Sequence, residues 1–108
     1  MILLVRPKLL RKNFNGMTLW PFVVVKHHLM KEDMVFLNHE KIHLRQQVEL
    51  LIVFFYLWYG LEFLYRFIQY RNRYKAYRNI SFEREAYHHE SDQFYLKKRK
   101  PYGFFKFL

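Results

Sequence analysis

Five consecutive residues, His39-Glu40-Lys41-Ile42-His43, form the pattern H-E-x-x-H. On an α-helix, side chains four residues apart lie on one face, so His39 and His43 can both bind one metal ion. Two neutral imidazoles suit tetrahedral Zn²⁺, which in a hydrolytic site takes a third protein ligand and a water molecule. The carboxylate of Glu40 can then take a proton from that water. The motif therefore predicts zinc-assisted hydrolysis with Glu40 as the general base.

The third zinc ligand must come from outside this motif. One known arrangement takes it from a residue that follows closely after a chain-turning glycine. In this chain Gln46 stands at the glycine position and Glu49 at the ligand position. Without a turn, Glu49 stays on the same helix, about 15 Å along the axis from His39. We therefore exclude Glu49 as a ligand.

A second arrangement takes a glutamate from a later helix, and Glu83-Arg84-Glu85-Ala86 supplies one. This segment resembles the E-x-x-A signature of gluzincin metallopeptidases, such as membrane CAAX-type proteases and small proteases that cleave phage or stress repressors. The resemblance covers this segment and the H-E-x-x-H motif only. It implies that His39, His43 and Glu83 bind zinc, and that the alanine lets the two helices approach. Glu85 stays open as an alternative third ligand.

The chain departs from the gluzincin pattern at Tyr87, where those families usually carry an Asp or Asn that orients a ligand histidine. Tyr87 and the adjacent His88 are candidates for supporting the ligands or for donating to an oxyanion. Asn38 directly precedes the motif, and Gln46 or Gln47 follows it by one turn. These three are candidate supporting residues, with an ordinary polar helix surface as the alternative.

The remaining segments must bring the glutamate back to the histidines, which predicts a mostly helical α+β fold in one domain, residues 1–108. Residues 1–30 form a β region, a small hairpin or sheet packed on the active-site helix. Within it we expect a strand at Ile2–Val5, a turn at Asn13–Gly16 and a strand at Thr18–Lys26, where Pro21 makes an edge or a bend. That edge either pairs with an extended peptide or simply borders the sheet.

Residues 31–59 are predicted to form the active-site helix, with acidic residues at its start. Residues 60–80 form a return segment, and Gly60 is expected to break the helix so that the chain can reverse. Residues 81–100 form the glutamate helix, with Ser81 as its N-cap and Pro101 and Gly103 after its end.

The composition sets limits on the partners. Nineteen Lys and Arg against nine acids give a net charge of +10, which favours anionic lipid headgroups or nucleic acid. No nucleic-acid-binding motif is present, so nucleic acid is the less favoured of the two. Val48–Ile68 is as long as a membrane span and largely apolar, although it contains Glu49, Glu62 and Arg66. It is either a membrane-buried or interfacial segment or the aromatic core helix of a soluble domain, because periodicity does not separate these.

The chain has no cysteine, so any zinc must be held by histidine and carboxylate. The N-terminus lacks the apolar run of a signal peptide, and we expect a cytoplasmic or inner-membrane-associated protein. The sequence thus predicts a small zinc metallopeptidase that hydrolyses peptide bonds of a peptide or protein substrate. The alternative is a non-catalytic basic protein at a membrane surface or in an interaction, with zinc as a structural staple. The oligomeric state is left open.

Overall fold

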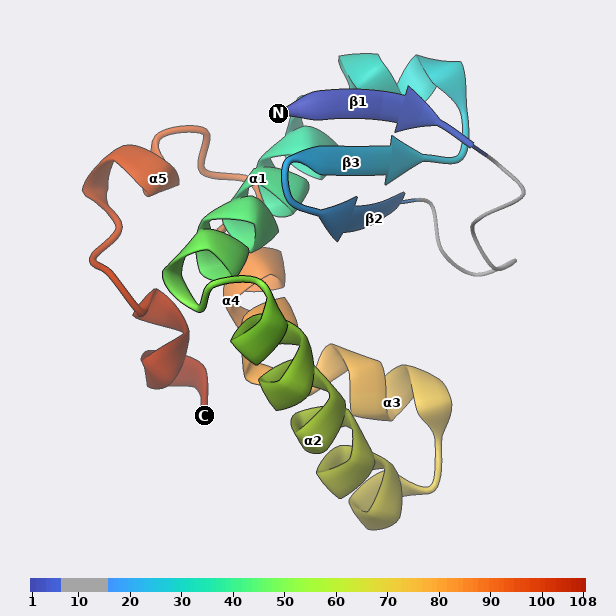
Figure 1. Cartoon of the computed structure of the whole chain (residues 1–108), viewed down its shortest axis with the longest axis vertical. Coiled ribbons are helices and arrows are strands. Elements are labelled where there is room, and N and C mark those ends of the chain that lie inside the picture. The colour runs from blue at the N-terminus through green and yellow to red at the C-terminus, as the bar shows by residue number, and fades with distance from the viewer. Residues whose placement is uncertain (7–15) are drawn as a thin grey trace.

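The computed structural model describes residues 1–6 and 16–108, except for the side chain of His28, so most of the predicted turn at 13–16 lies outside the described residues. The elements, shown in Figure 1, are strands β1 (Ile2–Val5), β2 (Gly16–Leu19) and β3 (Phe22–Val25), helices α1 (Met34–Glu49), α2 (Val53–Tyr70), α3 (Arg73–Arg78), α4 (Ser81–His89) and α5 (Tyr95–Lys98), and the short 3₁₀ helices η2 (His28–Glu32) and η3 (Gly103–Phe107). The predicted mostly helical α+β fold with a small sheet is confirmed.

The sheet has the strand order β1-β3-β2, with β1 parallel and β2 antiparallel to β3. The prediction of one strand over Thr18–Lys26 is wrong, because Trp20 and Pro21 form a turn that separates β2 from β3. Pro21 therefore bends the chain, one of the two outcomes expected for it. The central strand β3 carries three consecutive buried valines, as expected for a strand covered on both faces. Strand β2 is at the edge and contacts α1.

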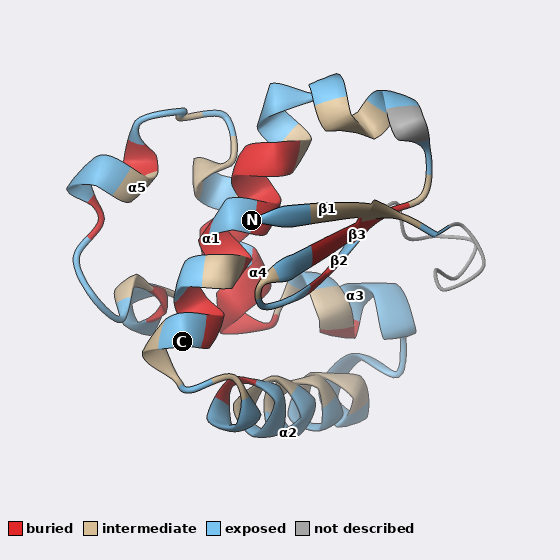
Figure 2. Ribbon diagram, turned by 45° about the horizontal axis from the view of Figure 1, so that its top comes forward, coloured by how far each residue is buried: buried red, intermediate tan, exposed pale blue. Residues whose placement is uncertain are grey.

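Helix α1 begins where Asp33 caps it by accepting a hydrogen bond from the backbone N–H of Phe36 at 3.0 Å. Its buried face is mostly polar, which is unusual because burying polar groups is costly unless they are bonded. Figure 2 shows this buried stretch of α1 lying against α4 in the centre of the molecule. The buried polar residues of the helix are Asn38, His39, Glu40, His43, Gln46 and Gln47.

The chain reverses direction earlier than predicted. Helix α1 ends at Glu49, and α2 begins at Val53 with its axis bent by 113° relative to α1. Leu51 has φ 57° and so occupies the left-handed position usually taken by glycine at a helix end. The backbone N–H of Leu51 donates to the carbonyl of Val48, and the backbone N–H of Ile52 donates to the carbonyl of Gln47. These two hydrogen bonds define a Schellman motif. The predicted break at Gly60 is therefore wrong, and Gly60 lies inside α2.

The glutamate helix is shorter than predicted. Helix α4 ends at His89, and α5 follows after a loop, so the helix predicted over 81–100 is two elements. Ser81 is the first helical residue rather than the N-cap. Its backbone N–H donates to the carboxylate of Glu62 at 2.8 Å, and its hydroxyl donates to the other oxygen of that carboxylate. A side chain of α2 therefore caps α4, where a negative charge also suits the helix dipole.

Besides the buried valines of β3, the described residues form two small apolar clusters, and α4 contributes to both. One contains Phe55, Ile80, Phe82 and Phe104, and the other contains Ile42, Ala86 and Tyr95. Ala86 and Ile42 are fully buried where α4 packs on α1. The small side chain at position 86 thus allows the close approach of these two helices that the gluzincin resemblance implied.

Candidate metal centre

Three side-chain atoms from two helices converge between α1 and α4. The Nε2 atom of His39 lies 3.2 Å from the Nε2 atom of His43, and both lie close to Oε1 of Glu83, at 3.2 and 3.0 Å. All three residues are buried. In tetrahedral zinc with ligand distances near 2.0–2.1 Å, neighbouring ligand atoms lie about 3.3 Å apart. The triangle is therefore close to the size that one zinc ion requires.

The outer nitrogens of both rings face hydrogen-bond acceptors. Nδ1 of His39 lies 3.1 Å from Oε2 of Glu90, and Nδ1 of His43 lies 2.8 Å from Oε1 of Gln46. An imidazole that donates from Nδ1 keeps a lone pair on Nε2. The acceptors therefore assign both histidines to the tautomer whose Nε2 lone pair points at Glu83.

Two lone pairs and a carboxylate oxygen at such short distances repel one another unless a cation lies among them. Burial opposes a charge on His43, but the Glu83 carboxylate outweighs this effect and raises the pKa of His43 to about 9. Burial likewise opposes ionisation of Glu83, yet the charge of protonated His43 and its contact with Glu83 hold the pKa of Glu83 well below its usual range. Without a metal the group binds a proton; a divalent cation would satisfy all three ligands at once.

The orientation of Gln46 is fixed by its other contacts. Its Nε2 donates to the backbone carbonyl of Phe82 at 3.1 Å and to Oε1 of Glu85 at 2.8 Å, which leaves its oxygen for His43. Burial raises the pKa of Glu85, but hydrogen bonds from Arg99, Tyr95 and Gln46 outweigh burial, so its pKa is lowered. Glu85, the alternative third ligand, therefore pairs with Arg99 and supports His43 through Gln46.

Glu90 performs the orienting role for His39 that the resemblance would give to position 87. It follows Glu83 by seven residues, two helical turns, and so shares its face of the helix. Asn38 holds the loop that carries it, because its side-chain N–H₂ donates to the carbonyls of His89, Glu90 and Asp92 at 3.3, 2.9 and 2.8 Å. Asn38, a predicted supporting residue, thus does not contact His39 through its side chain but holds Glu90, which does.

The second oxygen of Glu83 is also bonded. Tyr59 of α2 donates to Oε2 of Glu83 at 2.7 Å. Burial, followed by the negative charge of Glu83, raises the pKa of Tyr59 well above its usual value, so the phenol stays a donor. With Oε2 bonded to Tyr59, Glu83 would have only Oε1 left for a metal ion.

The expected general base, Glu40, is buried beside His39 and is held from the sheet. The hydroxyl of Thr18, on β2, donates to Oε2 of Glu40. A Cβ atom at Gly16 would lie 3.1 Å from Oε1 of Glu40 and 2.7 Å from Cε2 of Phe36. Glycine at position 16 therefore leaves the space that the carboxylate of Glu40 requires.

Gln47, another predicted supporting residue, contacts the sheet and none of the three ligands. Its Nε2 donates to the carbonyl of Thr18 at 2.8 Å, and its oxygen accepts from the backbone N–H of Trp20 at 2.7 Å. The hydroxyl of Tyr56 also donates to the carbonyl of Thr18. Because Thr18 contacts Glu40, Gln47 fixes the strand that holds Glu40. It also occupies part of the edge of β2 that was considered for peptide pairing.

A cavity of about 380 Å³ opens beside His39 and Glu40. Tyr87 lines it, with its ring 4.4 Å from that of His39, edge to face, and its hydroxyl 2.7 Å from that of Tyr77. The guanidinium of Arg78 lies over the Tyr87 ring, 3.7 Å from its centroid. Tyr87 thus supports His39 by packing rather than by the hydrogen bond of an Asp or Asn, and the cavity offers O–H and N–H donors.

His88 is placed away from the metal centre. Its side chain is exposed, and its ring contacts those of His89 and Phe107, at 4.6 and 5.6 Å. Thr18, Tyr59 and Glu90 also hold the site, although the sequence did not predict this role for them. The seven-residue spacing between Glu83 and Glu90 could have indicated Glu90. Thr18 and Tyr59 lie on β2 and α2, and the turns that place these two elements were not predicted.

Comparison with known proteins adds no family assignment to this geometry. No protein-family model, no curated protein and no solved structure matches the chain.

Proposed function

We propose that the protein is a zinc-dependent metallopeptidase that hydrolyses peptide bonds. The observation that carries this proposal is the convergence of the two Nε2 lone pairs and Oε1 of Glu83, with both Nδ1 atoms engaged by acceptors. His39, His43 and Glu83 would hold the ion. Bound there, zinc would supply the Lewis acidity that polarises a peptide carbonyl and acidifies water.

The general base is Glu40. It is the residue after the first ligand and it lines the same cavity as His39, while Oε2 is held by Thr18 and Oε1 borders Gly16. A carboxylate fixed by one oxygen can accept a proton on the other without having to be reoriented. The protonated phenol of Tyr77, whose pKa burial raises, also lines the cavity and can donate to a substrate oxygen.

The test is the variant Glu40→Gln, with Glu32→Gln, an exposed acid just before α1, as the matched control. Both variants and the unaltered protein are loaded with zinc, and their zinc content is measured. Hydrolysis is then followed on a mixed library of internally quenched peptides. Glu40→Gln should keep the zinc and lose activity by about 10²–10⁴-fold, because that is the usual contribution of a general base. Glu32→Gln should match the unaltered protein.

Equal cleavage by Glu40→Gln and the unaltered protein would refute the assigned base. If all three proteins hold zinc, cleave nothing in the library and unfold when a chelator removes the metal, the zinc-stapled interaction protein is the better description.

A further inference from the structure

Helix α2 presents an apolar face to solvent. Seven of its residues fall within about 120° of the helix circumference, and each is apolar or aromatic. Their side chains are between 55% and 67% exposed. We call this set the outer face of α2: Val53, Phe54, Leu57, Leu61, Leu64, Tyr65 and Ile68. Figure 2 shows the contrast between the exposed α2 and the buried α1 and α4.

Two polar side chains of α2 point inward, toward α4. Tyr59 donates to Glu83, and Glu62 accepts from the first residue of α4. Phe55 is the only buried residue of the helix. Helices on the surface of soluble proteins show the opposite arrangement, with the apolar stripe toward the core. Because its inner contacts hold the metal ligand and cap α4, α2 cannot rotate to hide its outer face without losing them.

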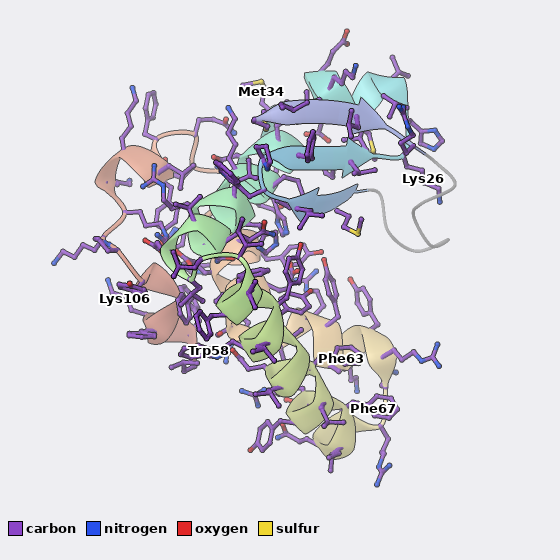
Figure 3. The ribbon with its side chains drawn as sticks, in the orientation of Figure 1. Lys26, Met34, Trp58, Phe63, Phe67 and Lys106 are labelled. Atoms are coloured by element: carbon purple, nitrogen blue, oxygen red, sulfur yellow. The ribbon has the colours of Figure 1, made fainter. Side chains whose placement is uncertain are left out.

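The sides of the helix are covered by the rest of the chain, but the outer face is not. Figure 3 shows Phe63 and Phe67 directed toward α3 and Trp58 directed toward the C-terminal segment. Trp58 packs on Phe104 and Phe105, at 5.1 and 6.0 Å between ring centroids. The seven exposed side chains therefore form one continuous strip between two covered sides, larger than the scattered apolar residues of an ordinary surface.

The charge around this strip is positive. Between residues 50 and 82 the chain has one acid, Glu62, and its carboxylate is bonded to Ser81. The same stretch carries five basic residues close to the C-terminal half of α2, namely Arg66, Arg71, Arg73, Lys75 and Arg78. A partner that covers the strip must therefore be apolar where it meets the helix and negatively charged beside it.

None of the described helices has, by itself, the length and composition of a membrane span. Only α1 and α2 taken together meet those two criteria, and the bend between them is 113°. In addition, α1 carries the buried polar residues of the metal centre. These features favour α2 lying along a membrane over α2 crossing it.

We propose that α2 docks in the plane of an anionic lipid membrane. The outer face enters the boundary between headgroups and acyl chains. Arg66, Arg71, Arg73 and Lys75 contact the headgroups, whereas Arg78 stays on the ring of Tyr87. This is the binding mode of interfacial amphipathic helices, whose affinity combines apolar burial with attraction to anionic lipid. A second copy of the chain is the competing occupant, but it would bring another +10 charge to the same surface.

The experiment measures co-sedimentation of the full chain with vesicles of phosphatidylcholine alone and of phosphatidylcholine mixed with phosphatidylglycerol. The protein should bind the mixed vesicles and be partly released by salt, because salt screens the charges. Leu57→Gln combined with Leu61→Gln should weaken binding by about 100-fold, about tenfold for each leucine side chain that no longer enters the lipid.

The matched control is Leu29→Gln with Met34→Gln. These residues are 75% and 58% exposed, and Met34 lies at the opposite end of the molecule from α2 (Figure 3). A second comparison uses two charge-reversal double variants. The variant that combines Arg71→Glu and Arg73→Glu should bind mixed vesicles less tightly, whereas the control that combines Lys97→Glu and Lys100→Glu should bind them as the unaltered protein does. All substituted residues are exposed, and circular dichroism and urea unfolding check that each variant is folded.

Three outcomes would overturn the proposal. One is absence of binding to mixed vesicles. Another is equal binding to neutral and mixed vesicles, which would show that anionic lipid is not required. The third is a dimer, measured by light scattering, that Leu57→Gln with Leu61→Gln converts to monomer while vesicles are ignored. None of these readouts depends on hydrolysis, so the docking proposal and the peptidase proposal fail separately.

Discussion

Replacing Gln46 by methionine should weaken zinc binding although Gln46 does not touch the ion. Methionine is close to glutamine in length and, like glutamine, is unbranched at Cβ and Cγ, so the fully buried space at position 46 stays filled. The variant loses two hydrogen bonds donated by Gln46, to Phe82 and Glu85, and one accepted from Nδ1 of His43. The perturbation is therefore confined to polar contacts around one ligand.

The magnitude follows from which partners are left unsatisfied. Glu85 retains Arg99 and Tyr95, so its carboxylate is still bonded. The Nδ1–H of His43 has no other acceptor among its contacts in the described residues, and an orphaned buried donor costs about 1–3 kcal/mol. Loss of a residue that orients a metal-bound histidine usually lowers metal affinity by about 10–100-fold. We expect a decrease in zinc affinity within that range.

Gln47→Met provides the control. Gln47 is the next residue, is equally buried and also makes three hydrogen bonds, to the carbonyl of Thr18, the N–H of Trp20 and the hydroxyl of Tyr56. None of these partners is a metal ligand. Both variants should lose similar stability in urea unfolding, and only Gln46→Met should lose affinity when zinc is titrated against a chromophoric chelator. Equal affinities for the two variants would refute the argument that Gln46 orients His43.

Two further predictions concern the same site. The metal-free group holds a proton on His43, whose pKa is about 9, and zinc must displace that proton. The apparent zinc affinity should therefore rise with pH by up to about tenfold per pH unit and level off above about pH 9. Competition with a chelator at a series of pH values measures this, and an affinity that does not change with pH would contradict it. Gly16→Ala should cost about 1–3 kcal/mol in urea unfolding, because the new methyl group crowds the ring of Phe36 and Oε1 of Glu40. Its zinc affinity should stay unchanged while hydrolysis falls, and an unaltered rate would show that Glu40 does not need that space.

The sequence correctly predicts that His39 and His43 lie together on one helix, because their relation is local. Residues 39 and 43 share a face in any α-helix, so only the helix itself had to be right. Glu83 came from a resemblance, and the structure brings its carboxylate to both histidines. The residues that orient these ligands were harder to predict, because Tyr59 and Thr18 reach the site through tertiary contacts.

The misplaced helix break has a specific physical cause. Glycine is the usual residue in the left-handed position of a Schellman motif, so Gly60 looked like the end of the active-site helix. In the structure Leu51 takes that position instead, and Gly60 sits inside α2 with nothing within 4 Å of where its Cβ would be. Tertiary contacts, including the bonds of Tyr59 and Glu62 to α4, compensate for the strain of a leucine with positive φ.

The same contacts explain why α2 exposes an apolar face to solvent. The metal centre needs a donor for the free oxygen of Glu83 and a cap for the start of α4, and α2 supplies both from one face through Tyr59 and Glu62. Because Tyr59 and Glu62 must face α4, the opposite side of the helix faces outward, and the seven apolar residues of the outer face lie there. An exposed apolar strip of this size is typical of a surface that meets a nonaqueous partner. A membrane would provide that partner without any change in the contacts that hold Glu83. The construction of the site and the exposure of the outer face are thus two consequences of one helix orientation.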